Sequence, residues 1–168
     1  MDMPADLYQV YAEFGMAAEK AQLVEMEAGN FALTFVAVFM DRERITPEVR
    51  AFFKALVEDV NRQTFGALLR VVKGFGTFDP LILEAVDEAL ELRNHLTHRF
   101  FRSHNFAILT EEGRRPMIAE LLSIKERLDR AHAILLGVCS SFAALHGFPN
   151  LPDEVARDLI GNGKRVAL

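Results

Sequence analysis

A short string near the middle of the chain combines three kinds of side chain that can act on a phosphate. It reads Arg93-Asn94-His95-Leu96-Thr97-His98. Arginine is a permanent cation, asparagine supplies a carboxamide, and the imidazole of histidine exchanges protons near neutral pH. Such a set can break a phosphodiester bond without a metal ion. Arg93, Asn94 and His98 are therefore the first candidates for a functional site.

The chemistry that this set allows is cleavage of RNA by its own neighbouring 2′-hydroxyl group. The imidazole of His98 would take the proton of that hydroxyl or protonate the leaving 5′-oxygen, a role that contributes roughly 10²–10⁴-fold. The guanidinium of Arg93 would stabilise the charge that develops on the phosphoryl oxygens. Because the nucleophile belongs to the substrate, DNA is expected to be inert.

The spacing of the three residues sets a geometric condition. Asn94 and His98 are four positions apart, so on a helix the carboxamide can contact the imidazole. Arg93 and His98 are five positions apart, which places them about 140° from each other around a helix. Their convergence requires a bent helix end, an extended arginine or a second copy of the helix. A twofold homodimer supplies the last of these.

The helix that carries the string is predicted to run from Pro80 to about Phe101, because Asp79-Pro80 is a typical start signal. Its first half is acidic and its second half basic, and no carboxylate occurs between Glu91 and Glu111. Complementation of the helix dipole accounts for this polarity. The further residues that could contact RNA phosphates are His95, Arg99, Arg102 and His104.

Projection of this helix at 100° per residue gives two stripes. One is apolar except for an arginine, which would be costly to bury unless it is paired, and comprises Ile82, Val86, Ala89, Arg93, Leu96 and Phe100. The other is wholly polar and comprises Glu84, Asp87, Glu91, Asn94, His98 and Arg102.

The rest of the chain also has helical periodicity, with no alternating strand pattern. We expect a first helix from about residue 5 to residue 38, a second from Thr46-Pro47, a further stretch at 65–72, and a long helix from Met117 to about Leu145. Thr110 offers a cap ahead of the last helix, although Pro116 complicates its start. The prediction is one all-α domain over residues 1–168. Its antiparallel four- to five-helix bundle has a core at about 5–148, and 149–168 form a short helix and tail.

Composition limits the classes of function. The formal net charge is −5, so RNA would have to bind a local basic patch. Cys139 is the only cysteine, which excludes an intrachain disulfide, and its apolar surroundings indicate core packing. No signal peptide is apparent, and the longest apolar run, residues 31–40, is far shorter than the roughly 20 residues of a spanning helix. These features predict a cytoplasmic protein without a membrane segment.

The string Arg93-Asn94-x-x-x-His98 resembles the motif of the HEPN family, in which arginine, a polar residue and three variable positions precede histidine. The resemblance implies a small all-helical homodimer that cuts RNA without a metal or other cofactor, in a toxin–antitoxin, phage-defence or stress system. It implies catalytic roles for Arg93 and His98 at the dimer cleft, a supporting role for Asn94, and an antitoxin or regulatory protein as partner. Members that are neutralised by nucleotidyltransferase partners carry tyrosine two residues after the histidine. Phe100 stands there, so that modification is not expected.

Two other interpretations remain open. Glu91, His95 and His98 have the spacing of metal ligands on one helix face, although His132 and His146 on the later helix lack companion ligands. Alternatively, the chain is a non-enzymatic helical homodimer that binds a partner, and the basic helix end is simply solvated. Some relatives in the HEPN family are non-catalytic.

Overall fold

The computed structural model describes residues 3–39, 66, 73 and 79–147. These residues form α1 (Ala5–Phe39), α4 (Pro80–His98), α5 (Phe100–Ser103), the 3-10 turn η2 (Ala107–Leu109) and α6 (Glu111–Leu145). The predicted all-α class is confirmed, and the described ranges contain no strand. Most of the predicted stretch at 65–72 lies outside the described residues, as do the helix predicted from Thr46-Pro47 and the piece within 149–168. The number of helices in the bundle therefore stays a prediction.

The chain divides into two compact units, one made of residues 1–27 and 76–135 and the other of 28–75 and 136–168. In the second unit, the buried ring of Phe31 packs edge-on against Phe142, with 5.6 Å between the centroids. Cys139 is buried there as predicted. The candidate site residues all belong to the first unit.

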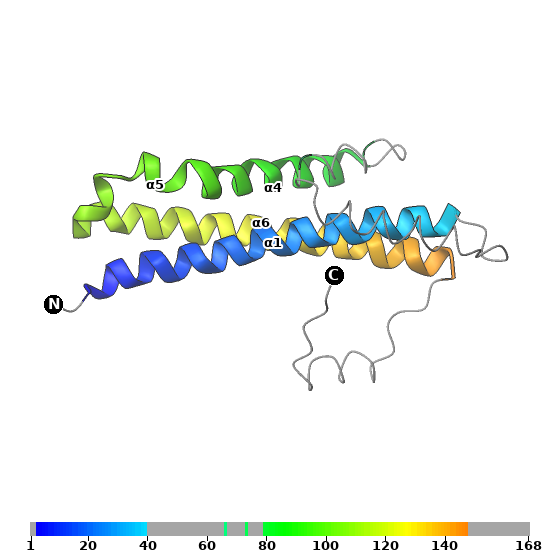
Figure 1. Ribbon diagram of the computed structural model, residues 1–168, viewed down its shortest axis with the longest axis horizontal. Helices are drawn as coiled ribbons and strands as arrows, with labels where there is room; N and C mark the ends of the chain where they lie inside the picture. The colour runs from blue at the N-terminus through cyan, green and yellow to red at the C-terminus, as the bar shows by residue number, and fades with distance from the viewer. Residues whose placement is uncertain (1–2, 40–65, 67–72, 74–78, 148–168) are drawn as a thin grey trace, which may run out of the picture. The chain divides into compact units, whose positions relative to one another are not determined.

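Ion pairs define the directions of the helices in the first unit. From α1 to α6, Asp6 pairs with Arg114, Glu13 with Lys125 and Lys20 with Asp129, so that residue numbers rise together and the two helices are parallel. From α4 to α6, Glu88 pairs with Arg127 and His95 with Glu120, so that residue numbers run in opposite directions. Helix α4 is therefore antiparallel to both of its neighbours, as the ribbon also shows (Figure 1).

Buried positions recur at alternating intervals of three and four residues in all three helices, which is the pattern of a coiled-coil seam. The core positions that follow it are Val10, Ala17, Ala21 and Val24 on α1, Ala85, Ala89, Leu92 and Leu96 on α4, and Met117, Leu121, Ile124, Leu128, Ala131 and Leu135 on α6. The buried positions on α1 and α4 include several small alanines, whereas those on α6 are mostly larger side chains. Each large side chain that is fully buried contributes about 1.5–3 kcal/mol.

The predicted helix starts are formed largely as expected. Asp79 caps α4 by accepting a hydrogen bond from the Leu81 amide at 2.8 Å, and Pro80 is the first helical residue. Thr110 caps α6, because its Oγ1 accepts a hydrogen bond from the Gly113 amide at 3.1 Å. Helix α6 begins at Glu111 rather than at Met117 and includes Pro116.

The helix predicted over Pro80–Phe101 is interrupted at Arg99, where φ is −123° and ψ is −32°. The break leaves His98 as the last residue of α4 and begins the four-residue helix α5 at Phe100. The backbone still donates from Arg99 to the His95 carbonyl at 2.9 Å and from Ser103 to the Arg99 carbonyl at 2.8 Å, so the change of direction is contained within one residue.

Candidate functional site at the end of α4

Arg93 lies at the edge of the core and is held by two other side chains. Its Nη1 donates a hydrogen bond to Asn94 Oδ1 at 3.3 Å, and its Nε lies 3.8 Å from Glu25 Oε2 on α1. The predicted apolar stripe placed Arg93 at a core position, but Leu92 fills that position and is 7% exposed. The side chain of Arg93 is 28% exposed, and the carboxylate of Glu25 offsets the cost of its partial burial.

His98 is exposed at the end of α4. Within the described part of the chain its imidazole has no hydrogen-bond or ion-pair partner. The predicted contact between Asn94 and His98 is not formed there either, because the Asn94 Oδ1 accepts from Arg93. Asn94 therefore orients the guanidinium rather than the imidazole.

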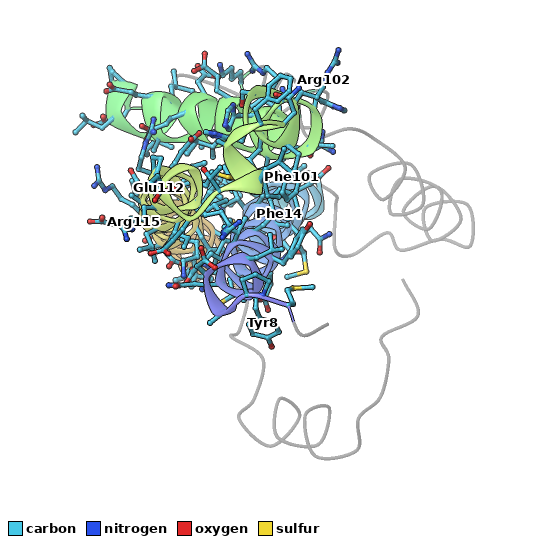
Figure 2. All side chains as sticks on the ribbon, turned by 90° about the vertical axis from the view of Figure 1, so that its left-hand side faces the viewer. Tyr8, Phe14, Phe101, Arg102, Glu112 and Arg115 are labelled. Atoms are coloured by element: carbon cyan, nitrogen blue, oxygen red, sulfur yellow. The ribbon has the colours of Figure 1, made fainter. Side chains whose placement is uncertain are left out.

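Arg99 and Arg102 are exposed beside His98, and among the described residues neither has a carboxylate partner. Figure 2 shows Arg102 projecting from α5 away from α1, whereas Phe101 lies toward Phe14 on α1. The predicted polar stripe is confirmed as surface, because Glu84, Asp87, Glu91, His98 and Arg102 are all exposed and Asn94 is half-buried.

His95 and His104, both predicted as contacts for RNA, meet the same carboxylate on α6. His95 Nε2 lies 2.7 Å from Glu120 Oε1, and His104 Nε2 lies 2.7 Å from Glu120 Oε2. An ionised carboxylate only accepts hydrogen bonds, so the Nε2 atom of each ring carries the proton. The two imidazoles are therefore engaged inside the unit, and Glu120, like Glu25, is a residue of this region that the sequence pattern did not single out.

Aromatic rings fasten α5 to the unit. Phe100 is fully buried and contacts His95 edge-on at 6.0 Å, His104 at 4.9 Å and Phe14 at 5.7 Å between centroids. Phe101 contacts Phe14 with 4.7 Å between the ring centroids and a tilt of 46° (Figure 2). Because α5 has one turn, these contacts rather than its own hydrogen bonds determine its position.

The turn between α5 and α6 is closed by Arg114, which is 8% exposed. Its Nε donates to Asp6 Oδ2 at 2.5 Å and its Nη1 donates to the Ile108 carbonyl at 2.9 Å. The hydrogen bond from Arg114 lowers the pKa of the Asp6 carboxyl below its ordinary value. Gly113 allows η2 to approach closely, because a Cβ at that position would lie 2.1 Å from the Ala107 carbonyl oxygen.

The described residues give no geometric support to the metal-site interpretation. Glu91, His95, His98, His132 and His146 all lie within residues 79–147, and in the described parts of the chain no three His, Cys, Asp or Glu side chains are placed to hold a metal ion.

Helix α6 is long and apolar enough to cross a membrane by length and composition alone, and 22% of its most apolar stretch is buried. A core helix of a soluble bundle passes the same test, so this is weak evidence for a membrane segment. The cytoplasmic location stays a prediction.

Comparison with protein-family models, with curated proteins and with solved structures gives no match to this chain. The geometry around Arg93 and His98 is therefore the basis for assigning a function.

Proposed function

We propose that this chain is a metal-independent endoribonuclease that resembles the HEPN family and cuts RNA by attack of the neighbouring 2′-hydroxyl. The proposal is carried by two side chains of the same helix: an arginine that other side chains hold in place, and a histidine that is exposed. Arg93 is fixed by Glu25 and Asn94, whereas His98, five residues later at the end of α4, is exposed and has no partner among the described residues.

Each side chain suits its proposed role. A guanidinium that is already positioned costs little reorganisation when charge develops on the phosphoryl oxygens, and removal of one such group typically costs about 10²–10³-fold in rate. An imidazole at the surface can reach a substrate and exchange its proton with water between turnovers. Asn94 supports the site through Arg93, and the exposed Arg99 and Arg102 are the candidates for contact with RNA phosphates.

The proposal includes a homodimer in which α4 of each copy faces the other. Two copies would place two Arg93–His98 pairs around one cleft. Arg93 of one copy could then act with His98 of the other, although the two residues are about 140° apart on a single helix. A cytoplasmic toxin–antitoxin, phage-defence or stress system, with an antitoxin or regulatory protein as partner, is the setting that the HEPN resemblance suggests.

The test is cleavage of a labelled single-stranded RNA by purified protein in excess EDTA. We expect the wild-type chain to cut RNA and to leave the matching DNA intact. His98→Ala should lower the rate by about 10²–10⁴-fold. Arg93→Ala should lower it by about 10²–10³-fold. His132→Ala, which changes a half-buried histidine of α6, is the matched control and should cut at the wild-type rate.

A second candidate function is a non-catalytic helical binding module, which the contact between Arg93 and Glu25 favours, since that contact alone would explain the arginine as an interhelical tie. The same assay separates the two candidates. Wild-type protein that leaves RNA intact, or a His98→Ala variant that cuts at the wild-type rate, contradicts the endoribonuclease and leaves the binding module.

A further inference from the structure

Glu120 holds the chain on both sides of His98. One carboxylate oxygen meets His95, three residues before His98, and the other meets His104, six residues after it, each at 2.7 Å. Between these two attachments lie the end of α4, the break at Arg99 and all of α5. We call this cluster of Glu120, His95 and His104 the carboxylate brace.

The brace is partly shielded from solvent, with 35% of the Glu120 side chain exposed. The two imidazoles are 26% and 19% exposed, and both contact the fully buried ring of Phe100. Partial burial lowers the local dielectric constant, which strengthens a hydrogen bond to a charged acceptor. Because one carboxylate serves both rings, a change at a single residue releases the segment from both sides.

The segment inside the brace has few other attachments of its own. Helix α5 is one turn long, and His98, Arg99 and Arg102 are exposed. Its remaining anchors are the rings of Phe100 and Phe101. Without the brace, the backbone at 98–104 would keep its hydrophobic contacts but would lose the polar contacts that fix its rotation relative to α6.

We propose that Glu120 is a positioning residue for the reaction assigned to Arg93 and His98, because the brace fixes the helix end from which the His98 imidazole projects. The catalytic part of this inference rests on the proposed function, whereas the structural part does not. Misplacement of a reacting group by about 1 Å can cost on the order of 10²-fold in rate, so loosening the brace should affect turnover more than substrate binding.

The chain offers a matched control for this idea. Glu88 and Arg127 form an ion pair between the same two helices, and each lies seven residues from its counterpart in the brace. Glu88→Ala therefore removes a comparable α4–α6 contact about two helical turns from His95 and about three from His98. Glu120→Gln is the conservative variant, because its side-chain oxygen can accept from one imidazole and its amide can donate to an unprotonated nitrogen of the other.

The first measurement is amide hydrogen exchange on the full-length chain. In Glu120→Ala, the amides of Arg99, Ser103 and His104 should exchange about tenfold faster or more, since hydrogen bonds to a charged group are lost. In Glu88→Ala these amides should keep the wild-type rate, and Glu120→Gln should recover most of the protection. Equal exchange at 99–104 in Glu120→Ala and Glu88→Ala would overturn the brace.

The second measurement is RNA cleavage in EDTA by the same variants. Glu120→Ala should lower kcat by about 10–100-fold with KM within about twofold of wild type, and Glu120→Gln should restore most of kcat. A wild-type kcat in Glu120→Ala despite faster exchange at 99–104 would overturn the positioning role while leaving the endoribonuclease intact. Absence of cleavage by the wild-type chain would overturn the proposed function and the catalytic part of this inference, and the exchange rates would still decide whether the brace exists.

Discussion

The six basic side chains between residues 93 and 104 fall into two groups that differ in their partners. Arg93, His95 and His104 turn toward other helices, where the carboxylates of Glu25 and Glu120 meet them. His98, Arg99 and Arg102 are exposed and lack a carboxylate partner within the described ranges. The comparison teaches that one basic segment contains two kinds of side chain, since half of them tie the segment to other helices and the other half are exposed.

This division also bears on the RNA-binding surface proposed for an acidic protein. The chain has a net charge of −5, which gives no overall attraction to a polyanion. Among the described residues, Glu25 and Glu120 lie on the inner side of the segment, and Arg99 and Arg102 on its outer side have no carboxylate partner. Three predictions test this contrast.

The largest effect is expected from removal of the Phe100 ring, which contacts the two histidines of the inner group. Phe100→Ala should lower the free energy of unfolding by about 3–5 kcal/mol, because it leaves a cavity beside His95, His104 and Phe14. Denaturant titration measures the change. Phe106→Ala is the control, since Phe106 is 78% exposed and its loss should change stability by less than about 0.5 kcal/mol. Similar losses in both variants would contradict this account of the inner group.

A smaller effect is expected at the turn that leads into α6. Gly113→Ala should destabilise the fold by about 1–3 kcal/mol, because the added Cβ would collide with the backbone of Ala107. The matched control is Gly15→Ala, a helical position with open space around a Cβ, where the same change should stabilise by about 0.5–1 kcal/mol. The two variants are expected to shift the thermal midpoint in opposite directions. A stabilised Gly113→Ala would show that η2 does not need this close approach.

The smallest effect concerns the outer group. Replacement of both Arg99 and Arg102 by alanine should weaken binding of single-stranded RNA and reduce the salt dependence of the affinity. With about 0.7 counterions released per phosphate contact, the slope of log K against log salt should fall by about 1.4. Fluorescence anisotropy in a His98→Ala background measures this without cleavage. The double variant Arg115→Ala, Arg130→Ala changes two exposed arginines of α6 and should keep the wild-type slope. An unchanged slope in the first variant would remove Arg99 and Arg102 from the RNA contacts.

Much of the fold could be predicted because its signals are local. The bounds of α1, the Asp79-Pro80 start and the Thr110 cap follow from periodicity and from side chains that bond to nearby backbone. The start of α6 was placed too late, because Pro116 removes one backbone donor and was taken as a barrier. Thr110, together with Arg114 tied to Asp6 and Ile108, secures the first turns around that defect.

The predicted stripe of α4 and the observed core share Ala89 and Leu96, but the stripe includes Arg93 where the core includes Leu92. When Leu92 and Leu96 are taken as seam positions, Arg93 falls on the flank of the seam. In antiparallel helices, residues beside the seam of one helix lie opposite residues beside the seam of the other. Glu25 has that position on α1, so it lies opposite Arg93. The heptad frame thus contained a signal for this pair.

The carboxylate brace could not be predicted in the same way. In the heptad frame, Glu88 and His95 on α4 and Glu120 and Arg127 on α6 share one flanking position, which is compatible with pairing between antiparallel helices. Sequence alone does not say which flanking residue of α4 lies opposite which residue of α6. That register depends on packing between helices and on the length of the turn from α5 to α6. The recruitment of His104 depends further on the break at Arg99.

The burial of Cys139 has a practical consequence. It is the only thiol of the chain and is 8% exposed, so maleimide reagents should meet little competition from it. A cysteine introduced on the outer side of α5 would then be the reactive group, and a spin label attached there would report the separation between copies of the chain in solution. The sequence therefore already provides a nearly silent background for testing whether copies of the chain associate.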